Sequence, residues 1–89
     1  MAKVILYKSN PCGYCSAAIR FLKEVKEQKE IEIIDLTGKF KERRDLAKKT
    51  GQRTIPQIYI NDVYVGGYDD MMLLERTGKL DPLLENTAD

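Results

Sequence analysis

The spacing of hydrophobic residues changes several times along this chain, and each change predicts a different element. A branched apolar run at Lys3–Tyr7 predicts a buried strand. From Gly13 to about Gln28, apolar residues recur every three or four positions, as on one face of a helix. Ile31–Leu36 predicts a second strand. A second helix is expected to begin at a cap formed by Thr37 or Gly38 and to run to about Thr50, with Gly51 as its stop.

The second half of the chain predicts a hairpin followed by helices. Gln57–Ile60 and Val63–Val65 predict two strands, joined by a tight turn at Asn61-Asp62. Gly66-Gly67 ends the hairpin. A helix capped by Asp69 or Asp70 should then run through Met71–Leu74 to Gly78, and a last short helix at Pro82–Glu85 should lead into a polar tail.

The resulting order is β-α-β-α-β-β-α. Two strands joined by a helix lie parallel with a right-handed crossover, and the hairpin adds antiparallel strands. The pattern therefore predicts an α/β fold with a four-stranded mixed sheet and helices on both faces. At 89 residues we expect a single domain, spanning residues 1–89.

Composition and net charge indicate which kinds of binding partner to expect. The net charge is +1, with 43% hydrophobic and 33% charged residues, and no aromatic platform accompanies the lysines, so we expect neither nucleic acid nor membrane as a partner. The longest apolar run, Val4–Tyr7, has four residues, and no secretory leader is recognisable. We expect a cytoplasmic protein.

The only two cysteines form a Cys-x-x-Cys motif, Cys12-Gly13-Tyr14-Cys15, between a predicted strand and a predicted helix. A thiolate at a helix N-terminus faces unpaired N–H groups and the positive end of the helix dipole, which makes it nucleophilic. Cys12 at the exposed edge is expected to be the nucleophile, and Cys15, one turn deeper, the resolving thiol.

Three other roles for the cysteines remain open from the residues alone. A structural disulfide would close a loop too short to constrain the unfolded chain much. A zinc site needs about four ligands, and the chain has two cysteines and no histidine. Two inert buried cysteines would not need this spacing.

Three further stretches are candidates for ligand contacts. Thr54-Ile55-Pro56 precedes a strand: a cis proline there would turn the Ile55 backbone outward to pair with an extended peptide, whereas a trans proline would merely start the strand. Gly66-Gly67-Tyr68-Asp69-Asp70 provides either an anion site at a helix N-terminus or a plain helix cap.

The third stretch is basic and runs from Lys39 to Arg53. It forms either a solvated helix face or a cationic rim that pairs with an anionic ligand, with Arg43 and Arg53 as the expected contacts.

With these motifs together, the chain resembles the glutaredoxins, small redox proteins with the thioredoxin-like fold. The resemblance covers nearly the whole length and rests on the Cys12–Cys15 motif, on Gly51-Gln52-Arg53-Thr54-Ile55-Pro56-Gln57-Ile58-Tyr59-Ile60 and on Gly66-Gly67-Tyr68-Asp69-Asp70. It implies a glutathione-dependent thiol–disulfide oxidoreductase that reduces protein–glutathione mixed disulfides and protein disulfides.

The resemblance also implies a glutathione site and assigns its parts. Tyr14 would flank the glutathione sulfur, and Ile55 would pair with the cysteinyl backbone. The amides of Tyr68 and Asp69 would hold the γ-glutamyl carboxylate, with Asp70 near the ammonium. The full implied set is Lys8, Tyr14, Arg43, Arg53, Thr54, Ile55, Pro56, Gly67, Tyr68, Asp69 and Asp70.

The chain departs from the family pattern at Gly13, at Tyr68 and at Ser9, which stands where the family's active-site lysine usually lies, with Lys8 one position earlier. Many dithiol members carry proline at the position of Gly13, and members without it more often bridge an iron–sulfur cluster between two subunits. A 2Fe–2S carrier dimer, ligated by Cys12 and glutathione, is therefore the alternative function, and otherwise we expect a monomer. A redoxin that takes electrons from thioredoxin reductase is a third possibility.

Overall fold

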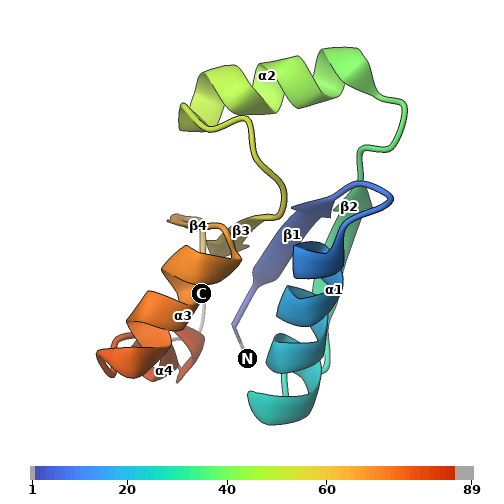
Figure 1. Ribbon diagram of the computed structural model, residues 1–89. Helices are drawn as coiled ribbons and strands as arrows, with labels where there is room; N and C mark the ends of the chain where they lie inside the picture. Colours follow the sequence, from blue (N-terminus) through green and yellow to red (C-terminus); the bar gives the residue numbers. More distant parts are fainter. Residues whose placement is uncertain (1, 86–89) are drawn as a thin grey trace.

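The four predicted strands form one mixed sheet in a computed structural model, which describes residues 2–85 (Figure 1). The spatial order is β2-β1-β3-β4. The strands are β1 (Val4–Lys8), β2 (Ile31–Asp35), β3 (Gln57–Ile60) and β4 (Val63–Gly66). The polar tail after Glu85 lies outside the described residues.

The sheet topology follows from the connections between the strands. β1 and β2 are parallel, with Leu6 opposite Ile33, because a helical crossover joins them. β3 is antiparallel to both β1 and β4. The β3–β4 turn has positive φ at Asn61 and Asp62 (51° and 65°), as two-residue hairpin turns require. The predicted topology and tight turn are therefore confirmed.

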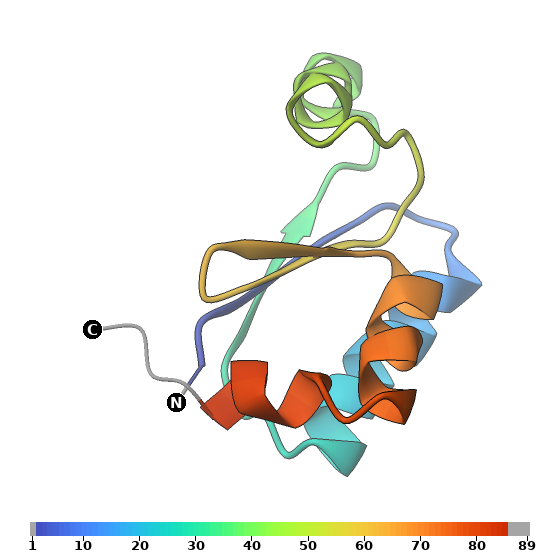
Figure 2. The ribbon, with the colours of Figure 1, turned by 90° about the vertical axis from the view of Figure 1, so that its left-hand side faces the viewer.

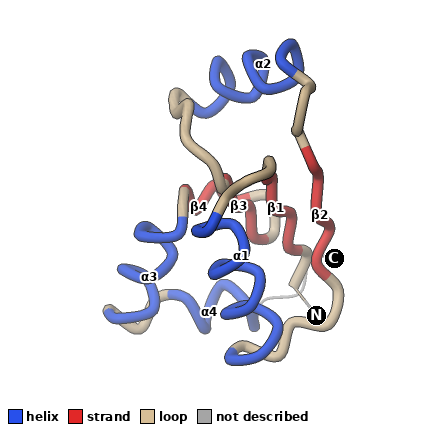
Figure 3. The backbone as a smooth tube through the Cα atoms, turned by 45° about the vertical axis from the view of Figure 1, so that its right-hand side comes forward, coloured by secondary structure: helices blue, strands red, loops and turns tan. Residues whose placement is uncertain are grey.

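Helices cover both faces of this sheet, as predicted. Figure 2 shows α1, α3 and α4 on one side and α2 on the other, and Figure 3 gives the same layers from a third direction. The bounds are α1 (Gly13–Arg20), η1 (Phe21–Val25), α2 (Phe40–Thr50), α3 (Tyr68–Arg76) and α4 (Leu80–Glu85).

The main core lies between the sheet and the layer formed by α1, α3 and α4. Its buried members come from every one of these elements: Ala2, Val4, Leu6, Ala18, Leu22, Ile58, Ile60, Met71, Leu80 and Leu84. Full burial of one such Leu or Ile side chain contributes about 1.5–3 kcal/mol. On the other face α2 buries only Leu46, so that helix keeps most of its side chains available to solvent.

Lys26, at the end of η1, forms ion pairs with one residue of α3 and one of α4. Its Nζ lies 2.7 Å from Oε1 of Glu75 and 2.9 Å from Oδ1 of Asp81, with the side chain only 13% exposed. Hydrogen bonds to Glu75 and then Asp81 raise the Lys26 pKa above its ordinary value. The ammonium also lies 5.7 Å from the centroid of the Phe21 ring.

Several predicted helix boundaries were wrong. The first helix does not continue regularly to Gln28, because its last part, η1, is a π-helix that ends at Val25. α2 begins after Lys39, not after Thr37 or Gly38. Thr37 is not a cap because its Oγ1 donates to Oδ1 of Asp35 (2.6 Å) and accepts from the Asn10 N–H (2.8 Å).

The later boundaries also differ. α3 is capped by Gly67, not by Asp69 or Asp70, and ends at Arg76, before Gly78. α4 begins at Leu80, two residues before Pro82, since proline is tolerated in the first turn of a helix. Gly51 does end α2, with φ 76° in the left-handed region.

Candidate active site

Cys12 is the N-cap residue of α1. Its backbone is extended (φ −158°, ψ 101°), and its Sγ accepts a hydrogen bond from the Cys15 N–H at 3.1 Å. The Ser16 N–H donates to the Cys12 carbonyl at 3.3 Å, which closes the first turn. An N–H aimed at the sulfur from a helix N-terminus stabilises a thiolate there when the pair is reduced.

The two cysteines form a disulfide, with their Cα atoms 5.3 Å apart. Cys12 is partly accessible, whereas Cys15 is fully buried. An incoming disulfide can therefore reach Cys12 but not Cys15, and Cys15 can reach the Cys12 sulfur from inside. This is the arrangement that thiol–disulfide exchange requires of an attacking and a resolving thiol.

The loop before β3 lies against the Cys12 sulfur. The carbonyl oxygen of Ile55 is 3.9 Å from Sγ of Cys12, and the Ile55–Pro56 peptide bond is cis. The Asn10–Pro11 bond, for which the sequence analysis made no prediction, is also cis. The structure thus brings Ile55 and Pro56 together with the cysteine pair, from segments more than forty positions apart in the chain.

Gln57 holds this loop in place, a role that was not predicted from the sequence. The side chain is 2% exposed, and its Nε2 donates to the carbonyls of Gln52 (2.7 Å) and Thr54 (3.1 Å). These bonds fix the backbone on both sides of Arg53. Its Oε1 is buried without a hydrogen-bond partner among the described residues. A polar residue opening a buried strand was the signal available in the sequence.

The N-terminus of α3 forms another part of the site. Gly66 has φ 111°, which only glycine adopts readily. Oδ2 of Asp70 accepts from the Gly67 N–H at 2.9 Å. The N–H groups of Tyr68 and Asp69 belong to the first turn and have no intrahelical acceptor, as at any helix start. They can bind an anion.

Two tyrosines connect α1 to α3 across the site. The rings of Tyr14 and Tyr68 lie 5.8 Å apart between centroids, at an interplanar angle of 36°. Tyr14 is 64% exposed, so most of its ring is available to a ligand beside Cys12. Tyr68 thus contacts the tyrosine of the Cys-x-x-Cys motif.

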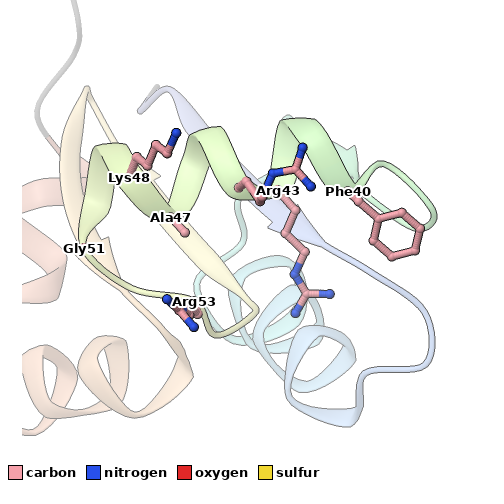
Figure 4. Close-up of a pocket in the computed structure, with 7 residues that line it drawn as sticks. Phe40, Arg43, Ala47, Lys48, Gly51 and Arg53 are labelled. Atoms are coloured by element: carbon pink, nitrogen blue, oxygen red, sulfur yellow. The ribbon is translucent and has the colours of Figure 1, made fainter.

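Arg43 and Arg53 line a common groove of about 840 Å³ on α2. Figure 4 shows Phe40 at one end of α2 and Gly51 at the other, with Arg53 below the helix on the loop that follows Gly51. Arg43 is half-buried and Arg53 is exposed, as is Thr54 in the following loop. Two cations of the candidate site are therefore brought to one surface, although they belong to different segments.

Lys8 lies at the end of a strand, next to an acidic residue of the neighbouring strand. It ends β1 opposite Asp35 of β2, and its carbonyl accepts from the Leu36 N–H at 2.7 Å. Hydrogen bonds from the hydroxyl and then the N–H of Thr37 lower the Asp35 pKa, and the charge of Lys8 lowers it slightly further. Lys8 thus has a carboxylate neighbour at the end of the sheet.

No helix in residues 2–85 is long and apolar enough to cross a membrane. Within the same residues, no group of three or more potential metal-ligating side chains (His, Cys, Asp or Glu) comes together.

Known proteins match both the sequence and the fold. The glutaredoxin family model matches residues 4–65. A glutaredoxin of Pseudomonas aeruginosa is 41% identical over 94% of this chain and 98% of its own length. Glutaredoxin 3 of Escherichia coli K12 is 34% identical over 96% of this chain and all of its own length.

Solved structures agree with these relatives. A buckwheat glutaredoxin–glutathione complex superposes with a TM-score of 0.82 and 29% identity, covering 93% of this chain and 76% of the other. The glutaredoxin of Brucella melitensis superposes with a TM-score of 0.79 and 39% identity, covering 96% of this chain and 90% of the other. With its Cys12–Cys15 pair, the chain belongs to the glutaredoxin family of thiol–disulfide oxidoreductases with the thioredoxin-like fold.

Proposed function

We propose that this protein uses glutathione to reduce protein–glutathione mixed disulfides and protein disulfides. The observation that carries the proposal is the surroundings of the Cys12 sulfur. This sulfur caps α1 and accepts a hydrogen bond from the Cys15 N–H, and the Ile55 carbonyl oxygen lies 3.9 Å from it. The similarity to a glutaredoxin that was solved with glutathione supports the choice of ligand.

In the first step the reduced Cys12 thiolate attacks the glutathione sulfur of a protein mixed disulfide. A Cys12–glutathione disulfide forms, the old disulfide breaks, and the protein thiolate leaves and takes a proton from water. The thiolate of a second glutathione then attacks the bound glutathione sulfur. This releases glutathione disulfide and restores Cys12. One free glutathione is consumed per cycle, and it leaves as glutathione disulfide together with the glutathionyl group that the substrate carried.

Protein disulfides are reduced by a second route, which uses Cys15. Cys12 forms a mixed disulfide with the substrate protein, and the Cys15 thiolate displaces the substrate by forming the Cys12–Cys15 disulfide. Two glutathiones then reduce that disulfide in successive exchanges. The full burial of Cys15 supports a role that is limited to intramolecular attack.

We propose that glutathione lies across the residues around Cys12. Its sulfur would lie beside the Tyr14 ring and its cysteinyl backbone would pair with Ile55. Its γ-glutamyl carboxylate would bind the free amides of Tyr68 and Asp69. The γ-glutamyl ammonium would then bind Oδ1 of Asp70, because Oδ2 accepts from the Gly67 N–H. The glycyl carboxylate would reach Arg43 or Arg53. Thr54, Pro56 and Gly67 would shape the backbone of this site, and Lys8 would add positive charge.

A 2Fe–2S form is the alternative. Residues 2–85 of one chain gather no group of three or more ligating side chains, so they offer no complete set of four cluster ligands. Two Cys12 thiolates and two glutathione sulfurs would have to supply them. Gly13 leaves room above the first turn, since a Cβ at that position would contact nothing within 4 Å.

We also propose that the chain works in the cytoplasm as a monomeric single domain. The sheet shares one core with α1, α3 and α4, which supports a single folding unit. Relatives from Pseudomonas aeruginosa and Escherichia coli support a bacterial-type glutaredoxin.

The deciding experiment measures turnover of the mixed disulfide of glutathione and 2-mercaptoethanol, with glutathione, glutathione reductase and NADPH. Cys12→Ser should fall to the uncatalysed rate. Cys15→Ser should keep this activity but lose the reduction of protein disulfides. Lys23→Ser, a change at an exposed residue outside the site, serves as the matched control. Wild-type turnover with thioredoxin reductase but not with glutathione would overturn the proposal.

A further inference from the structure

The helix α2 sorts its charges onto two faces. One face lines the groove of about 840 Å³ together with Arg53, and the residues that line it are Phe40, Arg43, Arg44, Ala47, Lys48, Gly51 and Arg53. These include four cations and no carboxylate. Both acidic residues of the helix, Glu42 and Asp45, line a separate recess on the side of the sheet. Such sorting makes the groove surface strongly and uniformly positive.

Within residues 2–85, no carboxylate forms an ion pair with any of the four groove cations. Among the described residues, the ion pairs of the molecule involve Lys3, Lys26 and Lys41, and none involves a groove cation. Asp45, the nearest acid along the helix to Arg44 and Lys48, is paired with Lys41 at 3.2 Å. The guanidinium groups of Arg43, Arg44 and Arg53 are thus available for bidentate contacts to carboxylates.

An exposed aromatic ring accompanies these charges. Phe40 is 72% exposed, and it stands at the N-terminal end of α2 in Figure 4. An apolar ring next to arginines is typical of a surface that binds polypeptide, because aromatic and arginine side chains dominate the energetics of such contacts. A small inorganic anion would leave the ring unused.

Glutathione alone would leave most of this groove empty. If the proposed function is correct, the γ-glutamyl end lies at α3 and only the glycyl carboxylate reaches Arg43 or Arg53. Arg44, Lys48 and Phe40 then have no ligand. The remaining part of the substrate is the protein to which the glutathionyl group is attached, and its chain must pass close to Cys12.

We propose that the α2 groove binds an acidic polypeptide segment next to the glutathionylated cysteine of the substrate protein. Carboxylates of that segment pair with Arg44 and Lys48, and an apolar side chain packs on Phe40. The proposal rests on the proposed function and adds a substrate preference to it: mixed disulfides in acidic surroundings are reduced faster than those in neutral surroundings.

The test compares two synthetic peptides of equal length, each with a single glutathionylated cysteine. One carries Glu residues around the cysteine, and in the other each Glu is replaced by Gln. Wild-type kcat/KM should favour the acidic peptide by about tenfold at low salt, which two or three exposed ion pairs can supply. The preference should shrink in 1 M salt, where the Debye length is only about 3 Å.

Two double variants locate the effect. Arg44→Gln/Lys48→Gln should reduce the preference to about twofold or less. Lys23→Gln/Lys29→Gln removes the same charge from exposed positions outside the groove and should keep the full preference. Both variants should retain wild-type activity on the small glutathione–mercaptoethanol disulfide, which also shows that they are folded.

The outcomes separate this proposal from the proposed function. Normal turnover of the small disulfide with equal kcat/KM for both peptides would refute the groove proposal but would leave the proposed glutathione activity intact. A preference that survives in Arg44→Gln/Lys48→Gln would refute it equally. Absence of turnover on the small disulfide would refute the proposed function, and the groove proposal with it.

Discussion

Gly66 is the position where one added methyl group should disturb both the fold and the site. Its φ of 111° lies in a region that other residues occupy only with strain. A Cβ there would lie 2.8 Å from Cγ and 3.0 Å from Cβ of Asp70. Gly66→Ala should therefore strain the backbone and push away the carboxylate that accepts from the Gly67 N–H.

The expected loss of stability is about 3 kcal/mol. Backbone strain at such a φ contributes about 2 kcal/mol. The displaced Asp70 hydrogen bond contributes about 1 kcal/mol, as other helix N-terminal bonds do. For a domain of this size the melting temperature should fall by about 15 °C. The Michaelis constant for glutathione should also rise, because Asp70 and the start of α3 belong to the proposed site.

Urea unfolding of the single and double variants tests this reasoning. Asp70→Ala alone should lose about 1 kcal/mol. In Gly66→Ala/Asp70→Ala there is no carboxylate to displace, so the double variant should be about 1 kcal/mol more stable than additivity requires. Gly38→Ala is the matched control: φ is 74° and nothing lies within 4 Å of the added Cβ, so only about 1 kcal/mol should be lost. Equal losses at Gly66 and Gly38, or strict additivity, would refute the account.

Three further changes give separate predictions. Gln57→Leu should raise KM for glutathione several-fold with little change in kcat, because it frees the loop around Arg53; an unchanged KM in the coupled assay would contradict this. Lys26→Met should lose about 2 kcal/mol in urea unfolding near neutral pH. Since the folded Lys26 pKa is raised above its ordinary value of 10.5, that difference should be constant from neutral pH up to about this value and shrink as the pH rises through the folded pKa. In the Cys12→Ser background, Tyr14→Ala should weaken the binding of glutathione measured by calorimetry. Phe40→Ala, a change at another exposed aromatic residue, should leave that binding unchanged.

The sheet was predictable because its signals are local and redundant. The apolar runs that formed β1 and β3 are bounded by turn residues, and Asn61-Asp62 requires positive φ wherever a two-residue turn occurs. Helix starts were less predictable, because short polar side chains have several possible partners. Thr37 has the chemistry of a cap, but it binds Asp35 and Asn10 instead, and Lys39 precedes α2 without a side-chain cap.

The site was predictable only where one motif carried its own chemistry. The spacing of Cys12 and Cys15 indicated a reactive pair at a helix start, and the structure has them there. Contacts between distant segments could not be inferred from spacing. The contact between the Tyr14 and Tyr68 rings depends on how α1 and α3 pack. The anchoring role of Gln57 depends on which backbone carbonyls the preceding loop turns inward.

The most direct test of the central claim is to look for glutathione attached to Cys12. The Cys15→Ser variant has one remaining cysteine, and it should be incubated with glutathione disulfide and its intact mass recorded. We predict one glutathionyl group, formed rapidly at neutral pH and removed by added glutathione, with no comparable adduct on Cys12→Ser. Failure of Cys15→Ser to form this adduct, or equally fast modification of Cys12→Ser, would contradict the account.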